Sequence, residues 1–110
     1  MASIDANALF NKMVSAASTA FKDKWPGVKS YAETELKKIA VNIASIEAQR
    51  LAGKMTEEQA RLQFRLQTNA SKTVLLAAQG MTTLVVEAAL NAALGVIKDT
   101  VNTALSFVLL

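Results

Sequence analysis

Apolar side chains recur at spacings of three and four residues over most of this chain, which is the period of an α-helix. The first such stretch covers residues 4–24, and Ser3 or Asp5 is a suitable N-terminal cap. We expect the Trp-Pro-Gly at residues 25–27 to end this helix, because the residue before a proline disfavours the α conformation. The apolar stripe of this first helix comprises Leu9, Phe10, Met13, Ala17, Ala20 and Phe21.

A second helix is predicted over residues 31–52. Ser30 and Glu33 have the spacing of a capping box at its start, and Gly53 suits a left-handed C-terminal cap. Shortly after Gly53 comes a second capping box, Thr-Glu-Glu-Gln at residues 56–59. A glycine stop, a short gap and a fresh cap predict a tight αα-hairpin. The apolar face of the second helix comprises Leu36, Ile39, Ile43, Ile46 and Leu51.

The third helix is predicted over residues 57–79, continuing or kinking into a further segment over residues 81–108. From Val74 onward, apolar residues cover most of the circumference, and the polar residues form one narrow seam. Gly80 interrupts the run, but one glycine in helical sequence costs only about 1 kcal/mol, so we expect no reversal of the chain there. The polar seam comprises Thr83, Glu87, Asn91, Lys98, Asn102 and Ser106.

These segments predict an all-α fold, a helical hairpin or bundle in a single domain of 110 residues. The final third carries more apolar circumference than the first two helices can cover. We therefore expect a homo-oligomer in which the long apolar C-terminal helices of several copies pack together in a coiled-coil-like manner. The predicted self-association residues are Val74, Ala77, Ala78, Met81, Leu84, Val85, Ala88, Ala92, Leu94, Val101 and Leu105.

Composition argues against catalysis. The chain has no Cys and no His, so the commonest general base, the commonest zinc ligand and any thiolate ligand are missing. Its four glycines are isolated and form no phosphate-binding loop. We predict a protein that is not an enzyme and has no catalytic residues, cofactor or metal. Five glutamates of the second and third predicted helices are interpreted as solvated: Glu33, Glu35, Glu47, Glu57 and Glu58.

Glu87 is the one charged residue within residues 73–97, and Asn91 follows it one helical turn later. A carboxylate buried in such a stretch would be a candidate proton carrier or base. On the polar seam it would instead face solvent, or bond across an interface to Asn91 or Thr83. The sequence leaves both interpretations open, so Glu87 and Asn91 are the candidate functional polar groups.

The net charge is +3, and the twelve Lys and Arg residues are spread along the chain. Nucleic-acid-binding proteins usually gather their basic residues on one face, so nucleic acid is not an expected partner. The first ten residues lack the basic region and apolar run of a secretory signal. We therefore expect a cytoplasmic or assembly-associated location rather than secretion.

Residues 73–97 also support a membrane hypothesis, because they are long enough to cross a bilayer core of roughly 30 Å. Against this hypothesis, the stretch contains the ionisable Glu87 and many alanines, which contribute little to insertion. An ionisable group near mid-span costs on the order of 2.5–3.5 kcal/mol on the scale measured for Asp, Lys and Arg. The alternative is a protein that inserts into a membrane or lies on its surface. Glu87 and Asn91 would then face a partner helix or an aqueous pore.

The Trp-Pro-Gly at residues 25–27 has the pattern W-x-G between two predicted helices. This pattern, in a chain of 110 residues, resembles the hallmark of the WXG100 family of small secreted proteins. The resemblance implies a dimer of helical hairpins, exported by a specialised system that also reads a C-terminal signal. The short preceding helix and the strongly apolar third helix depart from that family.

The function expected from the sequence is therefore non-catalytic. We expect a self-associating structural or adaptor subunit of a larger assembly, such as a virion, a filament or a secretion apparatus, with other subunits as further partners. The membrane protein and the WXG100-like dimer are the alternatives.

Overall fold

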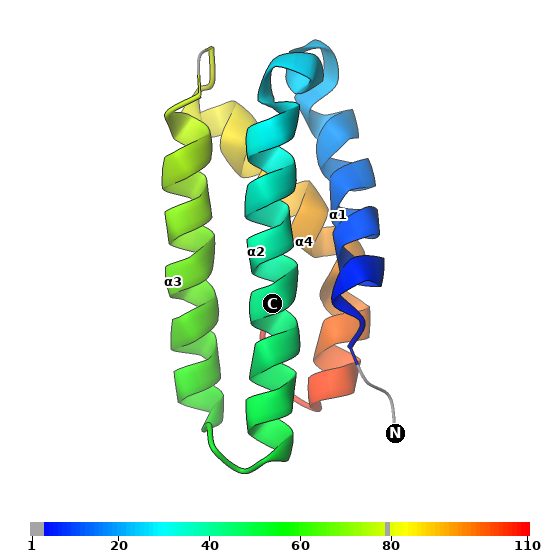
Figure 1. Ribbon diagram of the computed structural model, residues 1–110, viewed down its shortest axis with the longest axis vertical. Helices are drawn as coiled ribbons and strands as arrows, with labels where there is room; N and C mark the ends of the chain where they lie inside the picture. Colours follow the sequence, from blue (N-terminus) through cyan, green and yellow to red (C-terminus); the bar gives the residue numbers. More distant parts are fainter. Residues whose placement is uncertain (1–3, 79) are drawn as a thin grey trace.

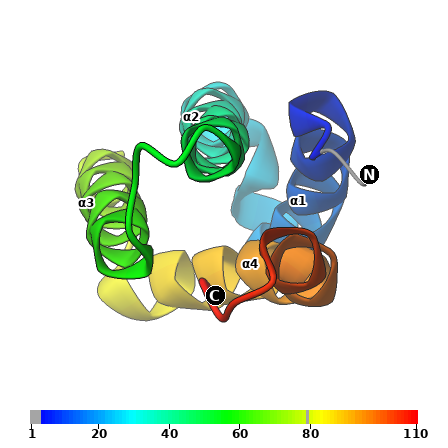
Figure 2. The same ribbon diagram turned by 90° about the horizontal axis from the view of Figure 1, so that it is seen from below.

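The computed structural model describes residues 4–78 and 80–110, and every regular element in these residues is helical. The helix α1 (Ala6–Phe21) is joined by a short 3-10 turn, η1 (Lys22–Lys24), to α2 (Trp25–Leu51). The order is completed by α3 (Glu57–Leu76) and α4 (Thr83–Leu105). α4 crosses obliquely from the end of α3 to α1 (Figures 1 and 2). The predicted all-α helical bundle is confirmed.

The corner between α1 and α2 differs from the prediction. Asp5 caps α1 with its carboxylate, and Lys22 takes a left-handed φ of 57° just after the helix ends. Residues 25–27 then form the first turn of α2 instead of ending a helix. Proline suits this position, because its missing N–H is not needed there and its fixed φ favours a helix start. The predicted start at residue 31, with Ser30 as the cap, is therefore wrong.

The α2–α3 hairpin is confirmed. Gly53 adopts a φ of 70° just after α2 ends. The Thr56 hydroxyl accepts a hydrogen bond of 3.1 Å from the Gln59 N–H, and the Gln59 side chain accepts one of 2.9 Å from the Thr56 N–H. This capping box starts α3, which then runs back alongside α2 (Figure 1).

α3 and α4 are separate helices, and the expectation that Gly80 would not reverse the chain is wrong. α3 ends at Leu76, and Gly80 takes a φ of 79° in the turn that follows. Gln79, the predicted last residue of the third helix, lies outside the described residues. Thr82 caps α4 by accepting a hydrogen bond of 3.3 Å from the Val85 N–H. A glycine with positive φ followed by a threonine cap thus separates these helices, as it separates α2 from α3.

α4 folds back onto the bundle and packs mainly on α1 (Figure 2). Its inner stripe joins one core with fully buried side chains of α1 and α2, including Met13, Ile39 and Ile43. Much of the apolar surface that the sequence assigned to other copies is therefore covered within one copy. Val101 and Leu105, predicted as self-association residues, are 0% and 8% exposed in the single chain. The buried stripe of α4 comprises Val86, Ala89, Leu90, Ala93, Ile97, Val101 and Leu105.

Candidate functional site

A shallow groove follows the outside of the bundle where α1 and α4 lie side by side. It consists of two neighbouring hollows, of about 520 Å³ and about 620 Å³, and Lys12 lines both of them. The two helices run in opposite directions along it, α1 away from the lower end of the bundle in Figure 1 and α4 towards it. We call this surface the α1–α4 groove and define it by Ala8, Lys12 and Ser15 of α1 and by Val96, Asp99 and Thr103 of α4.

The defining residues of the α1–α4 groove lie on one face of each helix, because their spacings alternate between three and four. All six are exposed, and Val96 is 48% exposed. Four of them have no more than three side-chain heavy atoms, which leaves both helix backbones close to the surface. A helix of another chain can therefore approach this groove closely.

Lys12 and Asp99 are the charged members of the groove, with opposite signs and on different helices. Both line the 520 Å³ hollow. The ion pairs among residues 4–78 and 80–110 join Lys38 to Glu35 and Lys72 to Glu87, so neither Lys12 nor Asp99 takes part in one. Asp5 lines the same hollow, but its carboxylate caps α1. Within the described part of the chain the groove therefore presents one cation, Lys12, and one anion, Asp99, that are not paired and do not cap a helix.

The predicted self-association residues do not form one surface. Val74 and Ala77 are exposed near the end of α3, and Val101 and Leu105 belong to the core. Four others, Ala78, Met81, Val85 and Leu94, are partly buried. The remaining three do share a face of α4, on which Leu84 and Ala88 are exposed and Ala92 is partly buried.

The candidate polar groups Glu87 and Asn91 lie on the outside of α4. Glu87 Oε1 accepts a hydrogen bond of 2.6 Å from Lys72 Nζ, which links α4 to α3, and 47% of its side chain is exposed. Asn91 is also exposed. The Glu87 carboxylate is therefore in contact with water and a cation, and is not enclosed by apolar side chains.

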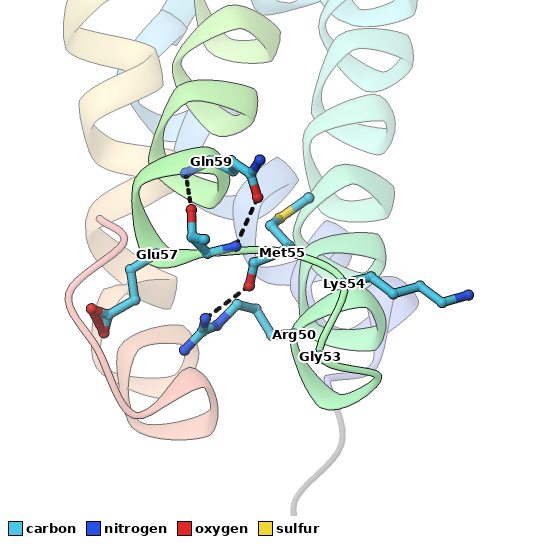
Figure 3. A pocket seen from close by; sticks show the side chains of 7 residues that line it. Arg50, Gly53, Lys54, Met55, Glu57 and Gln59 are labelled. Carbon is cyan, nitrogen blue, oxygen red and sulfur yellow. Dashed lines mark hydrogen bonds between the residues drawn. The ribbon is translucent and has the colours of Figure 1, made fainter.

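A separate hollow, of about 650 Å³, lies against the α2–α3 turn (Figure 3). The Arg50 guanidinium donates a hydrogen bond of 2.8 Å from Nη1 to the Met55 carbonyl oxygen, and the capping box of Thr56 and Gln59 forms another wall (Figure 3). The Lys54 side chain points away from the turn into solvent. Arg50, Thr56 and Gln59 thus already bond to the turn itself, and the other charged residues of the hollow, Lys54 and Glu57, are exposed.

Arg50 and Arg61 together enclose a side chain of the C-terminal segment, residues 106–110. Ser106 takes a left-handed φ of 62° and ends α4, short of the predicted end at residue 108. Phe107 is then buried, and the guanidinium carbons of Arg50 and Arg61 lie 5.1 Å and 5.2 Å from its ring centre. This geometry is that of cation–π contacts. The sequence carries no local signal for it, because α2, α3 and the C-terminal segment meet only in the folded chain.

Asn102 anchors the end of the same segment. Its Oδ1 atom accepts hydrogen bonds from the backbone N–H groups of Leu109 and Leu110, at 2.9 Å and 3.1 Å. Arg61 adds a hydrogen bond of 3.0 Å from Nε to the Val108 carbonyl oxygen. These bonds satisfy backbone groups that lie outside any helix, and they hold the segment against α3 and α4.

Two glutamates that were interpreted as solvated, Glu35 and Glu47, are buried, so the interpretation is wrong for them. Glu35 pairs with Lys38 at 3.2 Å, one turn along the same helix. Glu47 Oε1 accepts a hydrogen bond of 2.7 Å from the Ile4 backbone N–H. The start of α1 covers this side of α2, and the pattern of α2 alone does not reveal that cover.

The described residues bring no group of three or more acidic side chains together as a metal site. Within the same residues, none of the helices combines the length and apolarity that a membrane span requires. The chain matches no protein-family model, no curated protein and no solved structure in the comparisons. The resemblance to WXG100 proteins therefore gains no support there, and residues 25–27 begin α2 rather than forming the turn of a two-helix hairpin.

Proposed function

We propose that this chain is a non-catalytic helical subunit that associates with copies of itself as part of a larger assembly. The observation that carries the proposal is the outward ridge of α4, which we define by Leu84, Ala88, Ala92 and Val96. Residues four apart form one of the ridges through which helices pack on one another. Leu84 is 79% exposed, more than any other large apolar side chain of the described residues.

The outward ridge remains after the inner stripe of α4 has been covered by α1 and α2. Single exposed leucines are common on protein surfaces. Here, however, the ridge runs without a charged residue into the α1–α4 groove at Val96. Fully burying one leucine side chain contributes about 1.5–3 kcal/mol. A second copy would supply that burial, and three residues of the ridge were predicted to serve self-association.

Size-exclusion chromatography with light scattering tests the proposal at low and high micromolar concentrations. We expect a folded species whose mass is a multiple of 11.7 kDa. A well-folded monomer at every concentration would contradict the proposal. Circular dichroism on the same samples confirms that the helices are intact.

The variant Leu84→Gln should lower the average mass, because it places an amide on the outward ridge. Leu62→Gln is the matched control, since Leu62 is 52% exposed on α3, away from the ridge. If only the Leu62 variant lowers the mass, association uses α3 and the assignment to α4 is wrong. Flotation with liposomes that depends on Leu84 would assign the ridge to a membrane surface and contradict self-association as its role.

A further inference from the structure

We infer that two copies of this chain dock face to face through the α1–α4 groove, so that Lys12 of each copy pairs with Asp99 of the other. This inference rests on the proposed self-association, extends its surface from the outward ridge into the groove that the ridge meets at Val96, and names its symmetry. The occupant of the groove is thus a second copy of the same chain. Three features of the groove carry the inference: its shape, the arrangement of its two helices and its unpaired charges.

The first feature is the shape of the surface. The groove is hollowed by about 520 Å³ at one end and about 620 Å³ at the other, and most of its lining side chains are alanine, serine, threonine or valine. The other lining residues are Ile4, Asp5, Leu9, Asn11, Lys12 and Asp99. Such walls let helix axes approach to about 8–10 Å, the usual distance in packed helices. The walls of the groove are therefore suited to the close approach of a helical surface.

The second feature is the antiparallel arrangement of α1 and α4. A two-fold axis that runs along the groove, midway between them, places α1 of one copy over α4 of the other. Each α1 then lies antiparallel to the facing α4, as it does within a single copy. The result is a bundle of four helices, closed by symmetry, in which the same patch of each copy forms both halves of the interface.

The third feature is the position of the charges. Lys12 and Asp99 lie at the same level of the groove, since both line its 520 Å³ hollow. The two-fold axis therefore brings Lys12 over the partner's Asp99 and Asp99 over the partner's Lys12. Asp5, the other acidic residue of this hollow, already caps α1, because its Oδ1 atom accepts hydrogen bonds from the N–H groups of Asn7 and Ala8. The groove is thus complementary in charge to a second copy of itself.

The spacing of the groove residues also bears on the register, that is, on how the two copies align along the groove. Ala8, Lys12 and Ser15 on α1, and Val96, Asp99 and Thr103 on α4, follow the alternation of three and four that marks a helix–helix seam. Lys12 is the one charged residue among Ala8, Lys12 and Ser15, and Asp99 is the one among Val96, Asp99 and Thr103. A single charged residue in such a set specifies register, because sliding the helices would separate Lys12 from the partner's Asp99. The reciprocal pairs therefore select one alignment of the two copies.

Charge reversal tests the pairing directly. Lys12→Asp and Asp99→Lys each place like charges against one another twice per dimer, so each variant alone should raise the dimer dissociation constant at least about tenfold. A one-to-one mixture of the two variants should form a heterodimer, because both cross-pairs then join opposite charges. The double variant with both changes in one chain should dimerise as the natural chain does.

Lys54→Asp is the matched control, since Lys54 is exposed in the α2–α3 turn, far along the chain from the groove. It should leave the mass unchanged, and circular dichroism checks that every variant is folded. If the natural chain is oligomeric but the single variants keep its mass, the groove is not the interface and this inference fails while the proposed function stands. If the single variants are monomeric and their mixture stays monomeric, the charges act within one chain and the inference also fails. A natural chain that is monomeric throughout overturns both proposals.

Discussion

The Glu47 carboxylate holds the start of α1 against the last turns of α2 by accepting a hydrogen bond of 2.7 Å from the Ile4 backbone N–H. Glu47 is only 7% exposed, so this charge-assisted bond forms where water has little access. The contact spans 43 positions in the sequence. It fixes where α1 begins along α2, and α1 in turn forms one wall of the groove in which we place the dimer interface.

Replacing Glu47 should therefore destabilise the whole bundle. Glu47→Ala leaves the Ile4 N–H without its acceptor, and we expect a loss of about 1–3 kcal/mol in the free energy of unfolding. Glu47→Gln keeps an acceptor oxygen and should lose less. Urea denaturation followed by circular dichroism measures both. Glu33→Ala, on the same helix, is the control and should change stability by less than about 0.5 kcal/mol. Equal effects at Glu33 and Glu47 would show that the bond to Ile4 contributes nothing.

Phe107 should contribute to stability through both burial and its two cationic neighbours. Phe107→Ala is expected to cost about 3 kcal/mol, the low end for a buried phenylalanine, because the segment of residues 106–110 is not helical and can relax around it. Phe107→Leu keeps most of the apolar contact but removes the ring that faces Arg50 and Arg61, so we expect a loss of about 1 kcal/mol. Thermal denaturation ranks the variants. Val108→Ala is the control, since Val108 is largely exposed; an equal loss at Val108 would contradict a docked segment.

The two glycines that flank the first half of α4 should respond in opposite ways to alanine. Gly80 has a φ of 79°, so Gly80→Ala places a Cβ in a strained conformation and should destabilise the protein by about 1 kcal/mol. Gly95 lies within α4, and a Cβ there meets nothing within 4 Å. Gly95→Ala should therefore stabilise the protein by about 0.5–1 kcal/mol. The urea midpoints of the two variants should fall on either side of that of the natural chain, and a shift in the same direction would contradict the reversal at Gly80.

The sequence predicts helix boundaries well where the residues that end one helix and cap the next lie close together in the sequence. Gly53 and the capping box of Thr56 and Gln59 are an example, because each acts within a few residues of itself. Gly80 and Thr82 carry a related signal, but it lies in a stretch so apolar that the helical period continues across it. Gly80 alone does not predict the end of a helix, whereas Gly80 together with the Thr82 cap does.

The α1–α4 groove, in contrast, could not be predicted from the sequence. Lys12 and Asp99 are far apart along the chain, and they share a surface only because α4 turns back at Gly80 and packs on α1. The burial of Glu47 has the same origin, since the start of α1 covers it. Periodicity shows which face of a helix is apolar, but the neighbour that covers that face is decided by the path of the chain between helices.

The Lys72–Glu87 pair provides a final prediction, which separates the two roles considered for Glu87. The pair joins α3 to α4 at 2.6 Å, but 34% of the Lys72 side chain and 47% of the Glu87 side chain are exposed. Exposed ion pairs contribute about 0–1 kcal/mol, so Glu87→Gln should lower the free energy of unfolding by less than about 1 kcal/mol. The difference should shrink at high salt, where the Debye length falls to about 3 Å at 1 M. A loss of several kcal/mol that salt does not reduce would instead mean that the carboxylate is enclosed in an interface that one copy does not show.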